Sequence, residues 1–287
     1  MKTSNHLLRR LTAALLAAVL ALSIALPVFA SDDGDTIYIN SVSDLLSLAR
    51  SCAYDQWSVG KTVILQKDLS LEGMLWEPIP SFSGQFKGNG HTISDLTITG
   101  QYSPAGLFGI VEEQGSIESL SVRGVVSVSD SADTTTGGIA GINHGTLISC
   151  QFTGVVTGDS EVGGIVGRNE SEGTIDHSTA RAIVTGKSST GGIAGYNLGA
   201  ITGCTNVGSI NTEYPEASLD TDGFTAKMVD YINNKMAAAD DDATNSVTNV
   251  ATDTGGIAGR SSGMILTSVT TGTIGYEHVG YNVGGIV

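Results

Sequence analysis

The hydrophobic positions of residues 105–287 recur as short apolar stretches separated by glycine. Each unit opens on a Gly-Gly-Ile-like phrase, and the phrases begin at positions 105, 137, 163, 191, 255 and 284. The steps between these positions are 32, 26, 28, 64 and 29 residues, and a repeat of this size is typical of a solenoid. Each unit holds three short β-branched stretches punctuated by glycine, which predicts three short strands and no helix.

Strands this short cannot bury a face alone, so each strand is expected to pair with the equivalent strand of the next unit in a parallel sheet. The predicted fold is therefore all-β, a right-handed parallel β-helix. Its core would be columns of equivalent side chains, the first of which holds Ile139, Ile165, Ile193 and Ile257. Two more columns are predicted in the same way: Ile117, Leu147, Ile175, Ile201, Ile265, and Val126, Val156, Val184, Ile210, Ile274.

Asparagine recurs at one bend of three consecutive units, as Asn143, Asn169 and Asn197. Asparagine tolerates the left-handed backbone conformation, and we expect these residues to adopt it at the bend. Stacked amide side chains can also hydrogen-bond from one coil to the next. The three residues are therefore predicted to form a polar column at the bend.

The chain before the repeats divides into two parts. Residues 1–30 combine a basic start, an apolar run and small residues before Ser31, which predicts a secretory signal peptide and no membrane insertion of the mature chain. Residues 31–104 are predicted to form an N-terminal cap and the first coils. Within them, residues 41–53 read as an amphipathic helix that covers the open end of the solenoid.

Residues 105–287 are predicted to form the repeat domain, with a helical insertion at about 212–253 that explains the 64-residue step. The helix is expected at 222–239. It could bind a ligand or simply pack on the coils, and a degenerate extra coil is an alternative. The phrase at 284 stops where a coil should begin, so we expect the chain to continue into further repeats or domains.

The net charge of the chain disfavours some classes of binding partner. The formal net charge is −15, and it becomes −18 without the three positive charges of residues 1–30, which disfavours nucleic acid as a partner. Calcium binding by the acidic run Asp240–Asp242 is an alternative that we keep, although the sequence has no calcium-binding loop with regularly spaced Asp, Asn and Gly.

The cysteines are not expected to form disulfides. Cys150 and Cys204 lie two coils apart, which is too far for a disulfide, so all three cysteines are expected to be unpaired.

No catalytic motif is present. The five histidines include no His-Glu-x-x-His, and the chain has no Gly-x-Ser-x-Gly elbow and no phosphate loop. Catalytic, metal and cofactor residues are therefore not predicted. Carboxylates do occur in neighbouring coils and leave a two-carboxylate glycoside-cleaving site as an alternative; these are Asp159, Glu161, Glu172 and Asp176.

A possible ligand surface involves five residues. Arg168, Tyr196 and Arg260 share one repeat position, while Tyr276 and Tyr281 flank the last corner. Aromatic rings at these places could stack on sugar rings. The alternative is a solvated face whose arginines pair weakly with nearby acids.

The segment Phe86-Lys87-Gly88-Asn89-Gly90-His91-Thr92-Ile93, the phrase Gly106-Leu107-Phe108-Gly109 and the later Gly-Gly-Ile-Ala-Gly-x-Asn units resemble exported bacterial proteins that carry the GLUG motif. This resemblance implies a β-helical surface or secreted protein. Some such proteins are adhesin-like, and others are zinc-dependent IgA-cleaving peptidases with the repeats outside their catalytic domain. We therefore expect a non-catalytic secreted or cell-surface module whose partner is an extracellular protein or a glycan. The alternatives are a carbohydrate-active β-helix enzyme and the non-catalytic front part of a secreted peptidase.

Overall fold

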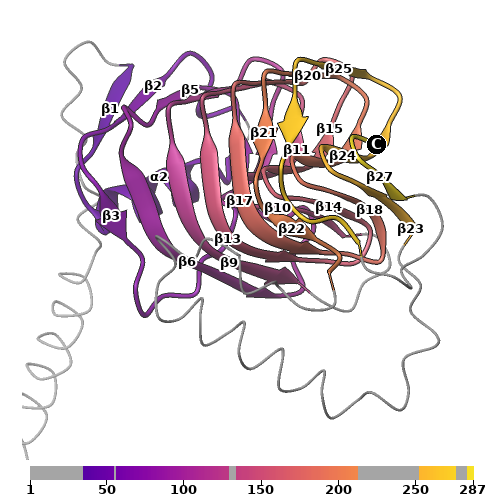
Figure 1. The fold of residues 1–287 in the computed structure, drawn as a ribbon. Coiled ribbons are helices and arrows are strands. Elements are labelled where there is room, and N and C mark those ends of the chain that lie inside the picture. Colours follow the sequence, from indigo (N-terminus) through magenta and orange to yellow (C-terminus); the bar gives the residue numbers. More distant parts are fainter. Residues whose placement is uncertain (1–34, 55, 129–133, 213–251, 276–282) are drawn as a thin grey trace, which may run out of the picture. The chain divides into compact units, whose positions relative to one another are not determined.

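The computed structural model describes residues 35–54, 56–128, 134–212, 252–275 and 283–287, all within one compact unit that spans Ser31–Val287. These residues wind through about seven turns of a parallel β-solenoid, with a single short α-helix among them. Figure 1 shows the strands of successive turns lying side by side, from indigo at the start to yellow at the end. The predicted all-β parallel β-helix is confirmed. The signal peptide and most of the 212–253 insertion lie outside the described residues.

Four parallel sheets, here named A to D, run along the solenoid. Sheet A consists of β1 (Thr36–Ile39), β2 (Thr62–Leu65), β5 (Gln85–Lys87), β8 (Ser116–Glu118), β12 (Thr146–Ile148), β16 (Thr174–Asp176), β20 (Ala200–Thr202) and β25 (Met264–Leu266). Sheet B consists of β3 (Leu69–Ser70), β6 (Thr92–Gly100), β9 (Ser121–Val128), β13 (Gln151–Thr157), β17 (Thr179–Thr185), β21 (Thr205–Asn206), β22 (Ser209–Ile210) and β26 (Val269–Thr270).

The other two sheets lie on either side of the glycine phrase. Sheet C consists of β4 (Ile79–Phe82), β7 (Phe108–Val111), β11 (Ala140–Asn143), β15 (Val166–Asn169), β19 (Ala194–Asn197) and β24 (Ala258–Ser261). Sheet D consists of β10 (Thr135–Gly137), β14 (Glu161–Gly163), β18 (Ser188–Gly191), β23 (Thr252–Gly255) and β27 (Val283–Gly284).

The repeat holds four strands per turn, not the predicted three. A full turn runs through sheets A, B, D and C, as in β12, β13, β14 and β15. Sheet D was missed because its strands are two to four residues long and lack an apolar stretch. The Gly-Gly phrase spans the corner between sheets D and C. Glycine is required there because a Cβ on Gly163 would lie 2.0 Å from the carbonyl oxygen of Val166.

The predicted isoleucine column is confirmed and is joined by main-chain hydrogen bonds. The amide nitrogen of Ile139 donates to the carbonyl of Ile165 at 2.9 Å, Ile165 donates to Ile193 at 3.0 Å, and Ile193 donates to Ile257 at 2.8 Å. All four side chains are fully buried. The other two predicted columns are also in register from coil to coil.

The asparagine column is confirmed as a hydrogen-bonded ladder. Asn143 Nδ2 donates to Asn169 Oδ1 and Asn169 Nδ2 donates to Asn197 Oδ1, each at 2.8 Å, and all three side chains are fully buried. The predicted left-handed backbone is wrong for these residues, because they end the strands of sheet C without a positive φ. The left-handed column lies instead at the corner between sheets A and B, at Ser119, Ser149, His177, Gly203 and Thr267.

The predicted capping helix is α2 (Val42–Ser51). Ser41 is its N-cap, and the Ser41 side chain accepts a hydrogen bond from the amide of Asp44. Leu45 and Leu48 are fully buried, and the helix contacts β1 and β4, the first strands of sheets A and C. The three cysteines are buried and unpaired, as predicted.

Candidate functional site

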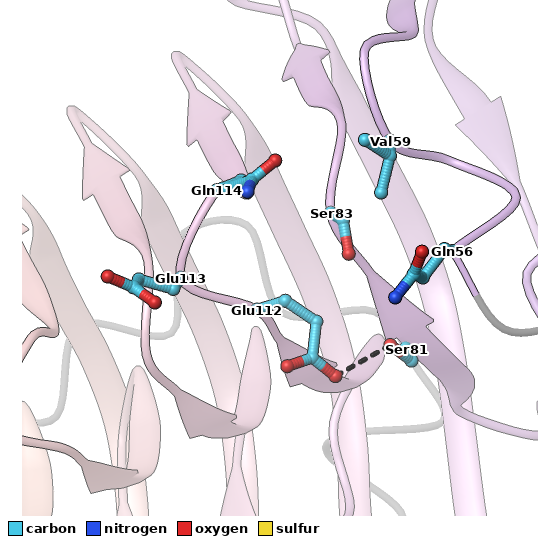
Figure 2. A pocket seen from close by; sticks show the side chains of 7 residues that line it. All are labelled: Gln56, Val59, Ser81, Ser83, Glu112, Glu113 and Gln114. Atoms are coloured by element: carbon cyan, nitrogen blue, oxygen red, sulfur yellow. Dashed lines mark hydrogen bonds between the residues drawn. The ribbon is translucent and has the colours of Figure 1, made fainter.

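A groove of about 410 Å³ lies where the loop after α2 meets the corner between sheets C and A. Figure 2 shows its two walls, the 56–59 segment on one side and the turn between β7 and β8 on the other, with the end of β4 between them. Its lining is almost entirely polar: Gln56, Val59, Ser81, Ser83, Glu112, Glu113 and Gln114.

The turn between β7 and β8 is held in place by main-chain hydrogen bonds. The amide of Glu112 donates to the carbonyl of Phe82 at 2.9 Å, and the amide of Gly115 donates to the carbonyl of Glu112 at 2.8 Å. Gly115 packs directly on the coil below, where a Cβ would lie 2.5 Å from the Phe82 oxygen. The turn therefore presents its side chains from a fixed backbone.

The opposite wall is fixed through Ser58, which is 2% exposed. Its hydroxyl accepts a hydrogen bond from the amide of Ser83 at 2.9 Å, and its carbonyl accepts one from the amide of Lys61 at 3.1 Å. Gly84 allows this close approach, because a Cβ there would lie 2.7 Å from the Ser58 carbonyl oxygen. Gln56 precedes this anchor in a left-handed conformation, with φ of 59°.

The groove side chains carry hydrogen-bonding groups that the protein itself does not use. Among the polar lining side chains, only Ser81 and Glu112 are bonded, and they bond to each other: the Ser81 hydroxyl donates to the Glu112 carboxylate at 2.7 Å. In the described part of the chain, the side chains of Gln56, Ser83, Glu113 and Gln114 have no hydrogen bond or ion pair. No lysine or arginine lines the groove, so its charge is negative. Across the described ranges, no three metal-ligating side chains gather into a possible metal site.

The residues of this groove were not predicted from the sequence. One signal was available, because the turn between the sheet C and sheet A strands differs in length from coil to coil. Three residues separate Val111 from Gly115, whereas one residue separates Asn143 from Gly145. Longer turns at a repeated corner are places where side chains can be added to the surface, but the turn at 170–172 is equally long, so length alone does not single out residues 112–114.

The comparisons with known proteins bear on the repeat itself. The family description "The GLUG motif" matches residues 158–185. The chain carries the GLUG motif. The matched segment is one full turn, from the end of β13 through β14, β15 and β16 to the end of β17.

Two curated proteins are similar to parts of the chain. Halomucin of Haloquadratum walsbyi is 32% identical in an alignment over 155 residues that covers 50% of this chain and 2% of halomucin. A "Putative Gly-rich membrane protein" of Evansella cellulosilytica is 29% identical in an alignment over 137 residues that covers 34% of this chain and 16% of that protein. The chain thus corresponds to a small part of either relative's length.

A solved structure is also similar, a "putative immunoglobulin A1 protease" from Bacteroides ovatus. It aligns at a TM-score of 0.46 and 13% identity, covering 88% of this chain and 85% of its own. Among the residues described for the GLUG-bearing chain, no helix has the length and apolarity needed to span a membrane.

Three of the five predicted ligand-surface residues come together, one within the GLUG segment and two on the strands that follow it. Arg168, Tyr196 and Arg260 are paired in register on adjacent strands of sheet C. The Arg168 guanidinium carbon lies 5.3 Å from the Tyr196 ring centroid, and that of Arg260 lies 5.5 Å from it. Since the two arginines come from the strands on either side, both faces of the ring are covered. Tyr276 and Tyr281 lie outside the described residues.

Arg168 is also bound to acids of its own coil. Its guanidinium donates to the Glu161 carboxylate with two nitrogens, and Glu170 lies 3.6 Å away. The hydrogen bond with Glu161 raises the pKa of Arg168 above its usual range. The charged and aromatic groups of this column therefore already have partners within the protein. Arg168 pairs with Glu161 and Glu170, and the Tyr196 ring contacts two guanidinium groups.

The carboxylates considered for glycoside cleavage mostly contact basic side chains of the chain itself. Asp159 lies 2.7 Å from the Lys187 ammonium, and Asp176 lies 2.8 Å from the His177 ring nitrogen. Glu161 is bound to Arg168, as described above. Glu172 is fully exposed, and a hydrogen bond from Ser171 lowers the pKa of its carboxyl. These contacts give each carboxylate a separate local partner. The calcium candidates Asp240–Asp242 lie outside the described residues.

Proposed function

We propose that the chain is a secreted or cell-surface module that acts without catalysis, as a rigid spacer that displays its corner loops to extracellular partners. The observation that carries the proposal is the unbroken stacking of the coils. The isoleucine column joins four coils by main-chain hydrogen bonds, and the asparagine column joins three of them by side-chain hydrogen bonds as well. A solenoid built in this way keeps its loops at a fixed spacing of about 4.8 Å per coil.

The corner loops can vary because the stack does not depend on them. The turn at residues 112–114 is three residues long and the equivalent turn at His144 is one residue long, yet the flanking strands remain in register. Such a scaffold can carry different binding loops on one constant core. This property suits adhesion or ligand display.

Two further observations support an extracellular location. Residues 1–30 have the sequence pattern of a secretory signal peptide. One similar protein is named a membrane protein and another is named halomucin. The partner of the module is proposed to be an extracellular protein or a glycan.

Surface labelling and force spectroscopy test the two halves of the proposal. An antibody against the solenoid should label intact cells or the culture fluid of the producing organism. Pulling single molecules should unravel the solenoid in steps of roughly one coil. A protein found only inside cells would contradict the location, and smooth extension without steps would contradict the rigid spacer.

A further inference from the structure

We propose that the groove between the 56–59 segment and the β7–β8 turn is a binding site for a neutral saccharide. This inference rests on the proposed display function and gives it a ligand class. The groove volume of about 410 Å³ falls within the range of roughly 300–1,000 Å³ that is usual for small-ligand sites. It is therefore large enough to hold a sugar ring.

The chemistry of the lining favours a ligand rich in hydroxyl groups. Each sugar hydroxyl both donates and accepts a hydrogen bond, and a primary amide offers both kinds of group in one plane. Gln56 and Gln114 supply two such amides, Ser83 supplies a hydroxyl, and Glu112 has a second carboxylate oxygen that can accept. The amides and the Ser83 hydroxyl have no partner within the described chain, so a ligand would not have to displace an existing bond.

The geometry brings these groups to one space. Figure 2 shows Gln56 and Glu112 pointing toward each other across the groove, with Ser83 between the two walls. The Ser81 hydroxyl fixes the Glu112 carboxylate at 2.7 Å. Because both walls are anchored by main-chain hydrogen bonds, little ordering is needed on binding.

Charge decides which saccharides fit. The lining holds two carboxylates and no cation, so a uronic acid or a sulfated sugar would be repelled. A divalent cation is disfavoured by the geometry, because Glu113 points away from Glu112 along the outer side of the turn (Figure 2). The only apolar lining residue is Val59, so the groove offers little to an apolar peptide side chain.

Ligand-observed NMR on the full chain tests the proposal. The probes are the neutral trisaccharides maltotriose, cellotriose, mannotriose and chitotriose, with trigalacturonate as the anionic comparison. At least one neutral probe should give a saturation-transfer signal, with a dissociation constant on the order of 1–10 mM for so small a ligand. Trigalacturonate should give none.

Two matched variants locate the binding. Gln56→Ala removes one amide from the groove and should weaken binding at least fivefold, whereas Gln66→Ala removes an exposed glutamine outside the groove and should leave binding unchanged. Circular dichroism checks that both variants keep their strands. The Gln56 change leaves the coil stack intact, because that side chain makes no internal bond.

Several outcomes would overturn the proposal: no signal from any neutral probe, equal binding of trigalacturonate, or equal loss in both variants. Binding that appears only with added calcium and disappears with EDTA would replace it by a cation site. None of these results affects the surface labelling or the force measurement, so a failed ligand assignment is distinguishable from a failed display function.

Discussion

Replacing Asn169 by alanine tests whether the buried amide ladder stabilises the coil stack. Asn169 occupies the middle of the ladder: its Oδ1 accepts from Asn143, and its Nδ2 donates to Asn197. The change would leave Asn197 Oδ1 buried without a donor and would deprive Asn143 of its best acceptor. A stranded buried acceptor costs about 1–3 kcal/mol and a lost hydrogen bond about 1 kcal/mol, so we expect a loss of about 2–4 kcal/mol.

Asn143→Ala is the matched control, because the same atoms are removed from an equally buried position. Asn143 ends the ladder, and its own Oδ1 has no hydrogen-bond partner in the structure. The next coil offers Val111 at this register position. Removing Asn143 strands the Oδ1 of Asn169 but also eliminates one orphan acceptor, so the two costs of about 1–3 kcal/mol each nearly cancel. The net change should stay within about 1 kcal/mol.

The assay is chemical denaturation of both variants and the parent chain, followed by circular dichroism. The ladder argument requires a clearly lower midpoint for Asn169→Ala than for Asn143→Ala. Equal midpoints, or a larger loss at Asn143, would mean that the amides act only as space-filling groups and that the hydrogen bonds between coils contribute little.

Three further changes test other parts of the structure. Gly154→Ala would place a Cβ 1.8 Å from the Gly124 oxygen at a φ of 149°, so the free energy of unfolding should fall by more than about 3 kcal/mol. Gly285→Ala is the control, because there is open space around that position, and it should change the denaturation midpoint little. Tyr196→Leu removes two cation–π contacts worth about 0.5–1 kcal/mol each; a loss no greater than that of exposed Tyr54→Leu would refute the stacking. Burial raises the pKa of Cys52 and Cys150 to about 12 and of Cys204 to about 11, while unfolded thiols ionise near pH 8.5. The thiols of the unfolded chain therefore lose their protons at lower pH than those of the folded chain, so the free energy of unfolding should fall as pH rises from about 9 to 12. A variant with all three cysteines changed to alanine, measured by denaturation at each pH, should show a weaker fall.

The core of the fold was predictable because the sequence repeats it. Ile139, Ile165 and Ile193 occupy one phase of the repeat, and that phase alone identifies a buried column. The asparagine ladder followed from the same reasoning. Its backbone conformation did not, because a preference of asparagine for the left-handed region says nothing about whether a particular asparagine ends a strand.

The strands of sheet D could not be predicted from the hydrophobic pattern, and the reason is a different one. A strand such as Glu161–Gly163 has only one buried apolar side chain, Val162, so it carries no hydrophobic alternation. Its strand character comes from pairing with the same residues of adjacent coils. Pairing across about 26 residues of chain cannot be inferred from a three-residue window.

The candidate groove could not be predicted because it joins a segment that does not repeat to the turn of one particular coil. Gln56 comes from the loop after the capping helix, and Glu112 comes from a turn that belongs to a later coil. The turn has an equivalent at residues 170–172, but the segment that contains Gln56 has none whose phase would place it against that turn. The sequence did predict that Arg168, Tyr196 and Arg260 share one face, but it could not show that the two guanidinium groups cover both sides of the ring.

The difference between repeated and non-repeated residues indicates which residues of a solenoid are candidates for ligand binding. In a solenoid, a residue that repeats is explained by stacking, because each coil must reproduce the contacts of its neighbours. Asn169, Ile165 and the Arg168–Tyr196 contact all fall into this class. Residues without an equivalent in other coils have no such explanation. The 56–59 segment is of this kind, and it forms one wall of the groove with a Gln56 side chain that bonds to nothing in the described chain. The departure from the repeat, more than the repeat itself, therefore carries the information about ligands.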